Sequence, residues 1–176
     1  GTNTDWAGKL VEKVSGMTLD RYFKKKIFKP LGIKSTYYNV PEKAKKRIVS
    51  MGNRGEDGKS KLREIDGDTE SPNRYPVGKT TKFSGGNGLF STPSDYTEIL
   101  QCMLNYGAYK GGRILKKETV EKMTENHIGD ISLDPTGWHY DPATCCNFNG
   151  LMDKESKWGL AFMIDNTPES YGRKAG

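Results

Sequence analysis

Three glycines lie within four residues, just before a strongly predicted helix, in the stretch SGGNGLFSTPSDYTEIL, residues 84–100. Glycine-rich turns before helices often bind phosphate, because an unobstructed backbone and the first N–H groups of a helix favour anions. The spacing argues against a nucleotide site. A dinucleotide loop reads G-x-G-x-x-G, and Ser91 stands where the third glycine belongs. A P-loop, G-x-x-x-x-G-K-[ST], also fails, because Asn73 stands where the first glycine belongs ahead of Gly78–Thr80.

No other motif completes a hydrolytic or metal site. Neither G-x-S-x-G nor S-x-x-K occurs in the chain. His127 and His139 lack a metal-ligating spacing such as H-E-x-x-H, so we expect structural roles for them. The cysteines Cys102, Cys145 and Cys146 contain no C-x-x-C pair, which indicates neither a zinc site nor a disulfide scaffold. We therefore assign no catalytic residue, metal ligand or cofactor to this chain.

The composition predicts part of a larger globular protein. Only 34% of the 176 residues are hydrophobic, 28% are charged and the mean hydropathy is −0.77. That leaves little apolar surface to offset the entropy of ordering the backbone, although periodic apolar segments exclude a disordered chain. No apolar run approaches the ~20 residues of a membrane span. The composition gives no prediction of compartment or oligomeric state.

The net charge of +6 comes mainly from two lysine-rich runs, residues 24–29 and 43–47. Such runs sometimes mark nucleic-acid or membrane binding. Here they alternate with apolar residues, so we interpret them as solvated faces and predict no nucleic-acid partner. A basic nucleic-acid-binding module stays as a minor alternative, which would predict an affinity that falls steeply with salt.

Hydrophobic periodicity predicts four helices. The first covers residues 4–15, capped by Asn3 or Thr4 and stopped by Gly16; the second follows Thr18 as its cap and ends before Pro30. We expect these two helices to form a hairpin in which each buries one face. The others are residues 93–106 and 116–126. In the first of these, Thr92 is the N-cap and Pro93 the first helical residue.

Elsewhere the chain is predicted to be mostly irregular. Residues 37–83 give short extended pieces, such as 47–51 and 74–83, separated by loops at 52–61 and 66–73. Residues 129–157 also have a loop composition. The segment KWGLAFMID, residues 157–165, alternates apolar and other residues, which predicts one strand with a buried face formed by Trp158, Leu160, Phe162 and Ile164.

Four blocks in this order resemble the serine β-lactamase-like family of penicillin-binding esterases, D-alanyl-D-alanine carboxypeptidases and fungal acyltransferases. The blocks are GTNTDWAGKLVEKVSGMTLDRYFKKKIFKPLGIKST, SGGNGLFSTPSDYTEILQCMLNYG, GGRILKKETVEKMTENHIGD and KWGLAFMID. The resemblance implies an α+β fold: an antiparallel sheet flanked by helices, plus a mainly helical region. We expect residues 1–176 to be a partial domain that covers mostly the helical region and one strand returning to the sheet.

The resemblance also implies acyl transfer through a serine. Such proteins use a Ser and a Lys in S-x-x-K, a Tyr in a second motif, and a late strand motif of the K-T-G, H-x-G or W-x-G type. A nearby base removes the serine proton, and backbone N–H groups stabilise the oxyanion. We expect this chain to be the span between the second and third elements, with the Tyr just before Gly1, and to be inactive alone.

The same resemblance predicts which residues border the cleft. Thr2 and Asn3 would lie at its rim, and Gly86 and Asn87 would lie beside its floor, where Asn87 offers an amide to the substrate. For Thr2 and Asn3 the alternative is simple helix capping. For the glycines it is a turn that leads into the helix after Thr92.

Trp138, Tyr140 and the loop 141–150 are further candidates for the cleft wall.

The expected substrate of the parent protein is a small-molecule ester, amide or lactam, and the expected partner of this chain is the remainder of its own domain. The alternative is a non-catalytic relative with a structural or assembly role. For a chain made alone, we expect exposed apolar faces at Leu10, Val14, Tyr22 and Phe162, and hence poor solubility.

Overall fold

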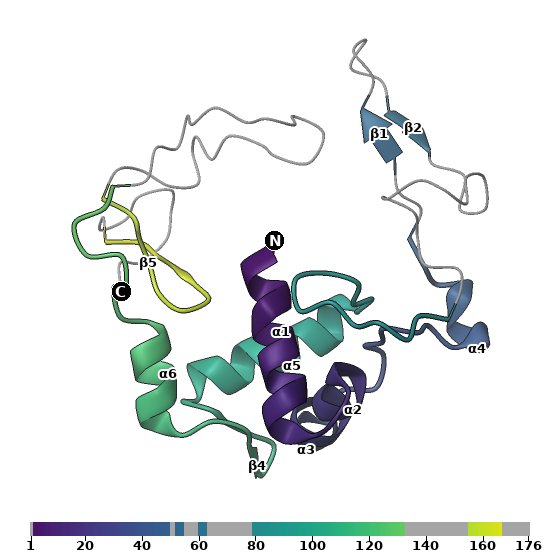
Figure 1. Ribbon diagram of the computed structural model, residues 1–176, viewed down its shortest axis with the longest axis horizontal. Helices are drawn as coiled ribbons and strands as arrows, with labels where there is room; N and C mark the ends of the chain where they lie inside the picture. Colours follow the sequence, from purple (N-terminus) through teal and green to yellow (C-terminus); the bar gives the residue numbers. More distant parts are fainter. Residues whose placement is uncertain (1, 50–51, 55–59, 63–78, 133–154, 167–176) are drawn as a thin grey trace. The chain divides into compact units, whose positions relative to one another are not determined.

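The computed structural model describes residues 2–49, 52–54, 60–62, 79–132 and 155–166 (Figure 1). The chain divides into two compact units, Gly1–Ile114 and Leu115–Gly176. The first contains α1 (Thr2–Ser15), α2 (Leu19–Phe23), the π-helical turn η1 (Lys24–Phe28), α3 (Lys29–Leu31), α4 (Glu42–Lys45), β1 (Gly52–Arg54), β2 (Ser60–Leu62), α5 (Pro93–Leu104), β3 (Ala108–Tyr109) and β4 (Gly112–Arg113). The second contains α6 (Lys117–Met123), β5 (Lys157–Trp158) and β6 (Met163–Ile164).

The described strands form three two-stranded antiparallel sheets: β1–β2, β3–β4 and β5–β6. The mixture of helices and antiparallel strands confirms the α+β class. The 52–61 segment, predicted as a loop, carries β1 and the start of β2, so that prediction was wrong at both ends. The 66–73 loop and residues 74–78 lie outside the described residues, and 79–83 form no strand.

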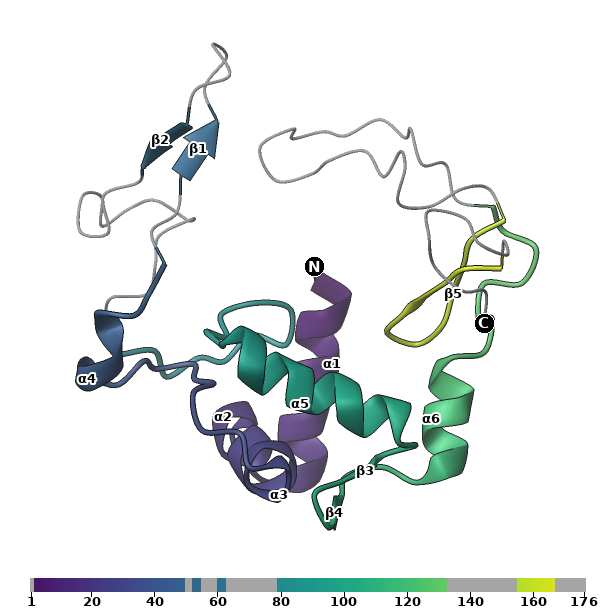
Figure 2. The ribbon, with the colours of Figure 1, turned by 180° about the vertical axis from the view of Figure 1, so that it is seen from behind.

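The core of the first unit lies between the α2–α3 helix and α5. Leu31 and Cys102 are fully buried, and Phe28 and Ile33 complete the cluster. Around them pack half-buried apolar residues of the same helices and of the β3–β4 segment (Phe23, Ile27, Ile99, Met103, Tyr109 and Ile114). The β4 strand lies against α3, as both views of the ribbon show (Figure 2). The core therefore fixes α5 relative to the α2–α3 helix.

The sequence predicted that the second helix ends before Pro30. That prediction was wrong, because Pro30 lies within α3. The helix runs from α2 through the π-helical turn η1 into α3 and ends at Gly32, whose φ of +70° is the left-handed conformation that favours glycine. A proline clashes with the carbonyl four residues earlier in an α-helix. The wider π turn changes the hydrogen-bond register just before Pro30, so the helix continues without that clash.

The caps of the first two helices also differ from the prediction. Asn3 and Thr4 are not caps, because α1 already includes Thr2. Thr18 is at the N-cap position of α2, but its side chain makes no capping hydrogen bond. Instead, Glu12 Oε1 of α1 accepts a hydrogen bond from the Leu19 N–H at 2.8 Å. The carboxylate of one helix thus caps the next.

The apolar stripe of α1 is exposed rather than buried in a helical hairpin. Trp6, Leu10 and Val14 expose 71%, 64% and 79% of their surface, which confirms the expected exposure of Leu10 and Val14. Tyr22 and Phe162 are half-buried. The buried side of α1 is marked by Gly8, the one residue of this helix classed as buried.

In the second unit, the predicted single strand at 157–165 is a hairpin. Lys157 pairs with Ile164 and Trp158 with Met163. The turn is closed by the Gly159 N–H, which donates to the Phe162 carbonyl at 2.8 Å, and Gly159 lies so close to α6 that a Cβ would collide with the Met123 carbonyl oxygen.

Neither Trp158 nor Leu160 belongs to a buried face, since they expose 39% and 58% of their surface. His127, predicted to be structural, is bound to the Lys122 carbonyl through Nε2 at 2.6 Å. None of the described helices is long and apolar enough to cross a membrane.

Candidate active-site wall

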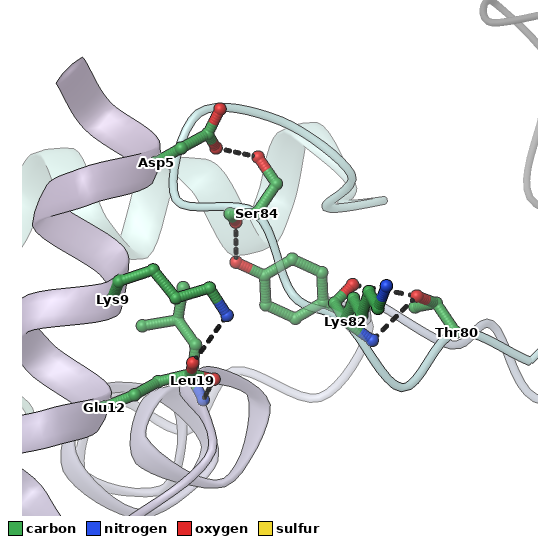
Figure 3. Close-up of polar contacts among 8 residues, drawn as sticks. Asp5, Lys9, Glu12, Leu19, Thr80, Lys82 and Ser84 are labelled. Carbon is green, nitrogen blue, oxygen red and sulfur yellow. Dashed lines mark hydrogen bonds and ion pairs between the residues drawn. The ribbon is translucent and has the colours of Figure 1, made fainter. Parts of the chain in front are cut away.

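The glycine-rich segment 84–88 is held against the first two turns of α1. The Asp5 carboxylate accepts a hydrogen bond from the Ser84 hydroxyl (Figure 3). It accepts another, at 3.0 Å, from the Gly86 N–H. Ser84 lies 79 residues after Asp5 in the sequence. Two of the blocks that carry the family resemblance therefore meet here.

Two facing glycines permit this approach of backbone to backbone. A Cβ on Gly85 would overlap the Thr4 carbonyl oxygen and lie 3.0 Å from the Gly8 nitrogen. A Cβ on Gly8 would lie 3.0 Å from the Gly85 Cα. The Thr4 carbonyl is backbone and cannot rotate away, so Gly85 requires glycine for a steric reason, whereas a Cβ on Gly8 would only be tightly packed.

Ser84 organises the turn that follows it. Its Oγ accepts hydrogen bonds from the N–H groups of Gly86 and Asn87, both at 3.1 Å. Its carbonyl oxygen accepts a hydrogen bond from the Tyr38 hydroxyl at 2.5 Å. These bonds fix the backbone of the glycine segment from two sides.

Tyr38 is the buried support of this segment, with only 3% of its surface exposed. Its ring lies between Phe23 and Phe83, at centroid distances of 6.1 and 5.0 Å. Burial raises the pKa of Tyr38 to about 12, and the negative charges of Asp20, Glu12 and Asp5 act in the same direction. Tyr38 therefore stays protonated and donates its hydrogen bond at every physiological pH.

Asp5 is the charged part of the contact. The hydrogen bond from Ser84 and then that from the Gly86 N–H hold its pKa below the usual value of a carboxyl group. Its place in the first turn of α1 also favours a negative charge, because the helix dipole is positive there. Asp5 is thus a permanent carboxylate that anchors the loop, not a proton donor.

A second carboxylate anchors the other end of the same segment. Asp95, in the first turn of α5, accepts hydrogen bonds from the Ser35 N–H at 2.6 Å and the Thr36 hydroxyl at 2.9 Å. Its own N–H donates to Thr92 Oγ1 at 3.2 Å, which confirms the predicted cap of α5 with Pro93 after it. Residues 84–95 are therefore tied to the rest of the first unit at both ends.

The four predicted substrate-binding residues occupy the two sides of this contact. Thr2 and Asn3 are exposed in the first turn of α1, directly before Thr4 and Asp5, and Gly86 and Asn87 are exposed in the loop that Asp5 holds. Within the described ranges, the side chains of Thr2, Asn3 and Asn87 make no hydrogen bond.

The remaining candidates for the cleft wall, Trp138, Tyr140 and the 141–150 loop, lie outside the described residues. Sequence reasoning missed Asp5 and Tyr38. In the sequence, Asp5 is recognisable only as an acidic residue in the first turn of a helix, and such a residue usually interacts with the helix dipole. No group of three or more His, Cys, Asp or Glu residues in the described part of the chain could hold a metal ion.

A family model described as "Beta-lactamase" matches residues 1–172, and the chain belongs to the β-lactamase family. The matched range is consistent with the blocks that carried the resemblance in the sequence.

Two relatives and one solved structure show how similar this chain is to members of the family. The chain is 29% identical over 182 residues to monacolin J acid methylbutanoyltransferase of Aspergillus terreus, covering 99% of this chain and 41% of the relative. It is 37% identical over 131 residues to lovastatin esterase of Penicillium rubens, covering 73% of this chain and 30% of the relative. A mutant of simvastatin synthase from Aspergillus terreus superimposes with a TM-score of 0.68 and 28% identity, covering 92% of this chain and 38% of that structure.

The chain therefore spans well under half the length of the relatives it matches. The named relatives include an acyltransferase and an esterase, which supports the serine hydrolase and acyltransferase class for the family.

Proposed function

We propose that this chain is one wall of the active site in a serine hydrolase or acyltransferase that works through an acyl-serine intermediate. The substrate is an ester, an amide or a β-lactam. The observation that carries the proposal is the contact of Asp5 with Ser84 and Gly86, which joins the start of α1 to the glycine loop. The catalytic Ser, Lys and Tyr belong to the parent protein, so the 176 residues alone are inactive.

In this reaction the two sides of the wall have different tasks. The glycine loop presents backbone without side chains at Gly85 and Gly86, so a substrate can approach it closely. The Asn87 side chain offers an amide that donates to a substrate carbonyl or leaving group. Thr2 and Asn3 line the rim next to the catalytic Tyr, which we place directly before Gly1. An anchored loop orients the acyl group without an entropic cost at the moment of reaction.

The first experiment asks whether the parent protein is an enzyme of this class. The protein containing these residues together with the upstream Ser and Lys is incubated with a fluorescent penicillin and with a fluorophosphonate, and its hydrolysis of nitrophenyl esters is measured. We expect covalent labelling or ester hydrolysis that disappears when the S-x-x-K serine is replaced by alanine. If neither label reacts and no ester is hydrolysed, the acyl-transfer function is refuted and the non-catalytic alternative gains support.

The second experiment tests the role of Asn87. One hydrogen bond to the substrate is worth about 0.5–1.5 kcal/mol, so Asn87→Ala is expected to lower kcat/KM about threefold to tenfold. Gln101→Ala is the matched control, because Gln101 is an exposed amide in α5. If the two variants have equal kcat/KM, Asn87 does not contact the substrate.

A further inference from the structure

A pocket of about 330 Å³ lies between the segment 35–49 and the residues that lead into α5. Its volume is at the lower end of the range of small-molecule sites, which is about 300–1,000 Å³. We call it the Arg47 pocket. Most of its lining is apolar and comes from Val40, Ala44, Ile48, Val49, Leu89 and Phe90.

The two walls of the Arg47 pocket are held together by backbone. Tyr37 and Phe90 exchange two antiparallel hydrogen bonds, each of 2.8 Å. The hydroxyl oxygens of Thr36 and Ser91 are also 2.8 Å apart and hydrogen-bonded. The pocket is therefore formed before any ligand arrives, which lowers the cost of binding.

Two apolar side chains of the pocket are left in contact with water. Val49 exposes 79% of its surface and Leu89 exposes 41%. An apolar ligand lying across them would remove this surface from water, and the affinity would then increase with the apolar length of the ligand.

Among the described residues of the lining, Arg47 alone carries a charge. The Arg47 guanidinium donates a long hydrogen bond, 3.4 Å from Nη2 to Ser35 Oγ. None of the ion pairs among the described residues includes Arg47. A guanidinium is always protonated and its parallel N–H groups fit a carboxylate.

Tyr37, the other large polar side chain of the lining, already donates its hydroxyl hydrogen to the Lys34 carbonyl. The anionic head of a ligand therefore belongs at Arg47.

We propose that the Arg47 pocket binds a small amphiphilic monocarboxylate, with its hydrocarbon chain on the apolar lining and its carboxylate on Arg47. The proposal rests on the lining of this pocket alone, so it holds whether or not the parent protein is an enzyme. It is also close to the candidate active-site wall in sequence, because Leu89 follows Asn87 on the same anchored segment.

The test is a titration of the whole chain with hexanoate, octanoate and decanoate, followed by calorimetry and by amide NMR. Each pair of added methylenes is expected to raise the affinity about fifteenfold, since one buried methylene is worth about a factor of four. The amide shifts are expected at residues 35–37, 44–49 and 89–91.

Charge and apolar contact are separated by variants. Arg47→Gln is expected to weaken octanoate binding at least about tenfold, because a charge-assisted hydrogen bond is lost. Lys46→Gln is the matched control, since Lys46 is the adjacent exposed cation and does not line the pocket. Octan-1-ol, which has no charge, is expected to bind Arg47→Gln and the unchanged chain equally. Leu89→Ser is expected to weaken octanoate and octan-1-ol alike, by severalfold.

Three results would overturn the proposal. The first is an equal effect of Lys46→Gln and Arg47→Gln, which means non-specific attraction to a basic surface. The second is a set of shifts centred on Lys24, Lys29 and Lys34, which line a separate groove of about 370 Å³. The third is an affinity that does not change with chain length. An unchanged amide spectrum of Arg47→Gln outside the pocket shows that the variant is folded.

Discussion

Replacing Gly85 by alanine tests the contact on which the candidate active site rests. The new Cβ overlaps the Thr4 carbonyl oxygen and approaches the Gly8 nitrogen to 3.0 Å. Both obstacles are backbone atoms of α1, so no rotamer change relieves the collision. We expect the segment 84–88 to move away from α1 and to lose the hydrogen bonds from Ser84 and Gly86 to Asp5.

The size of the effect follows from the cost of inserting one extra methyl group into a close-packed contact. Such overpacking costs about 1–3 kcal/mol. Because the loop opens locally, this free energy appears as faster amide exchange at Gly86, whose N–H is bound to Asp5 at 3.0 Å. The expected increase in the exchange rate is about fivefold to a hundredfold.

Amide hydrogen exchange followed by NMR measures this directly. The control is Gly111→Ala in the β3–β4 turn, where a Cβ meets no atom within 4 Å but φ is +77°. That variant carries only backbone strain, about 1–2 kcal/mol, and is expected to leave the exchange of Gly86 unchanged. If Gly85→Ala leaves the exchange rate of Gly86 within twofold of the unchanged chain, the loop does not depend on this glycine contact and the reasoning is wrong.

Three further predictions concern the groups that anchor the same segment. Asp95→Ala removes the acceptor of the Ser35 N–H and one of the two hydrogen-bond partners of the Thr36 hydroxyl, and is expected to destabilise the chain by about 2 kcal/mol, measured by urea unfolding. An absorbance titration of the phenol groups is expected to contain one step near pH 12, which disappears in Tyr38→Phe, because burial raises the pKa of Tyr38 to about 12. The pKa of Asp5 is lowered in the folded state, so its stabilisation of the loop is complete above the unfolded value of 3.8 and is lost as the pH falls through the folded value. The protection factor of Gly86 is therefore expected to fall at acidic pH, and Asp5→Asn is expected to remove that dependence.

Each of these has a result that contradicts it. For Asp95, it is an unfolding midpoint equal to that of Asp130→Ala, since Asp130 is an exposed acid of the other unit. For Tyr38, it is a phenol titration complete near pH 10. For Asp5, it is a protection factor at Gly86 that has the same pH dependence in Asp5→Asn as in the unchanged chain.

The sequence predicts the helices of this chain well where a local signal decides them. Thr92, Pro93 and the periodic apolar residues after them define α5, because a cap and a helical stripe are properties of adjacent residues. Gly16 after α1 is another local signal, and its φ of +66° confirms it as the stop of that helix. The family could also be identified from the sequence, because four blocks that resemble it occur in the family's order.

Where the prediction failed, a feature that simple capping and periodicity rules do not consider decided the structure. Pro30 did not end its helix, because a π turn formed ahead of it. Thr18 is not a side-chain cap, because Glu12 of another helix takes that hydrogen bond. The predicted strand at 157–165 is a hairpin, and its turn residue Gly159 packs against the Met123 carbonyl of α6. Alternation and capping rules consider only neighbours in sequence, so they cannot show such contacts.

Rules that consider only neighbours in sequence also missed the two contacts that hold the glycine loop. Asp5 and Asp95 are both first-turn acids, which a local rule assigns to the helix dipole. In the structure each binds a different chain segment, and together they hold both ends of residues 84–95. The glycines are then required by the approach to α1 rather than by a phosphate. Asn87 lies between the two anchors, so a ligand that meets its amide meets a loop whose backbone is already ordered. Ordering the backbone at Asn87 therefore takes place on folding, and its entropy does not reduce the affinity for a ligand.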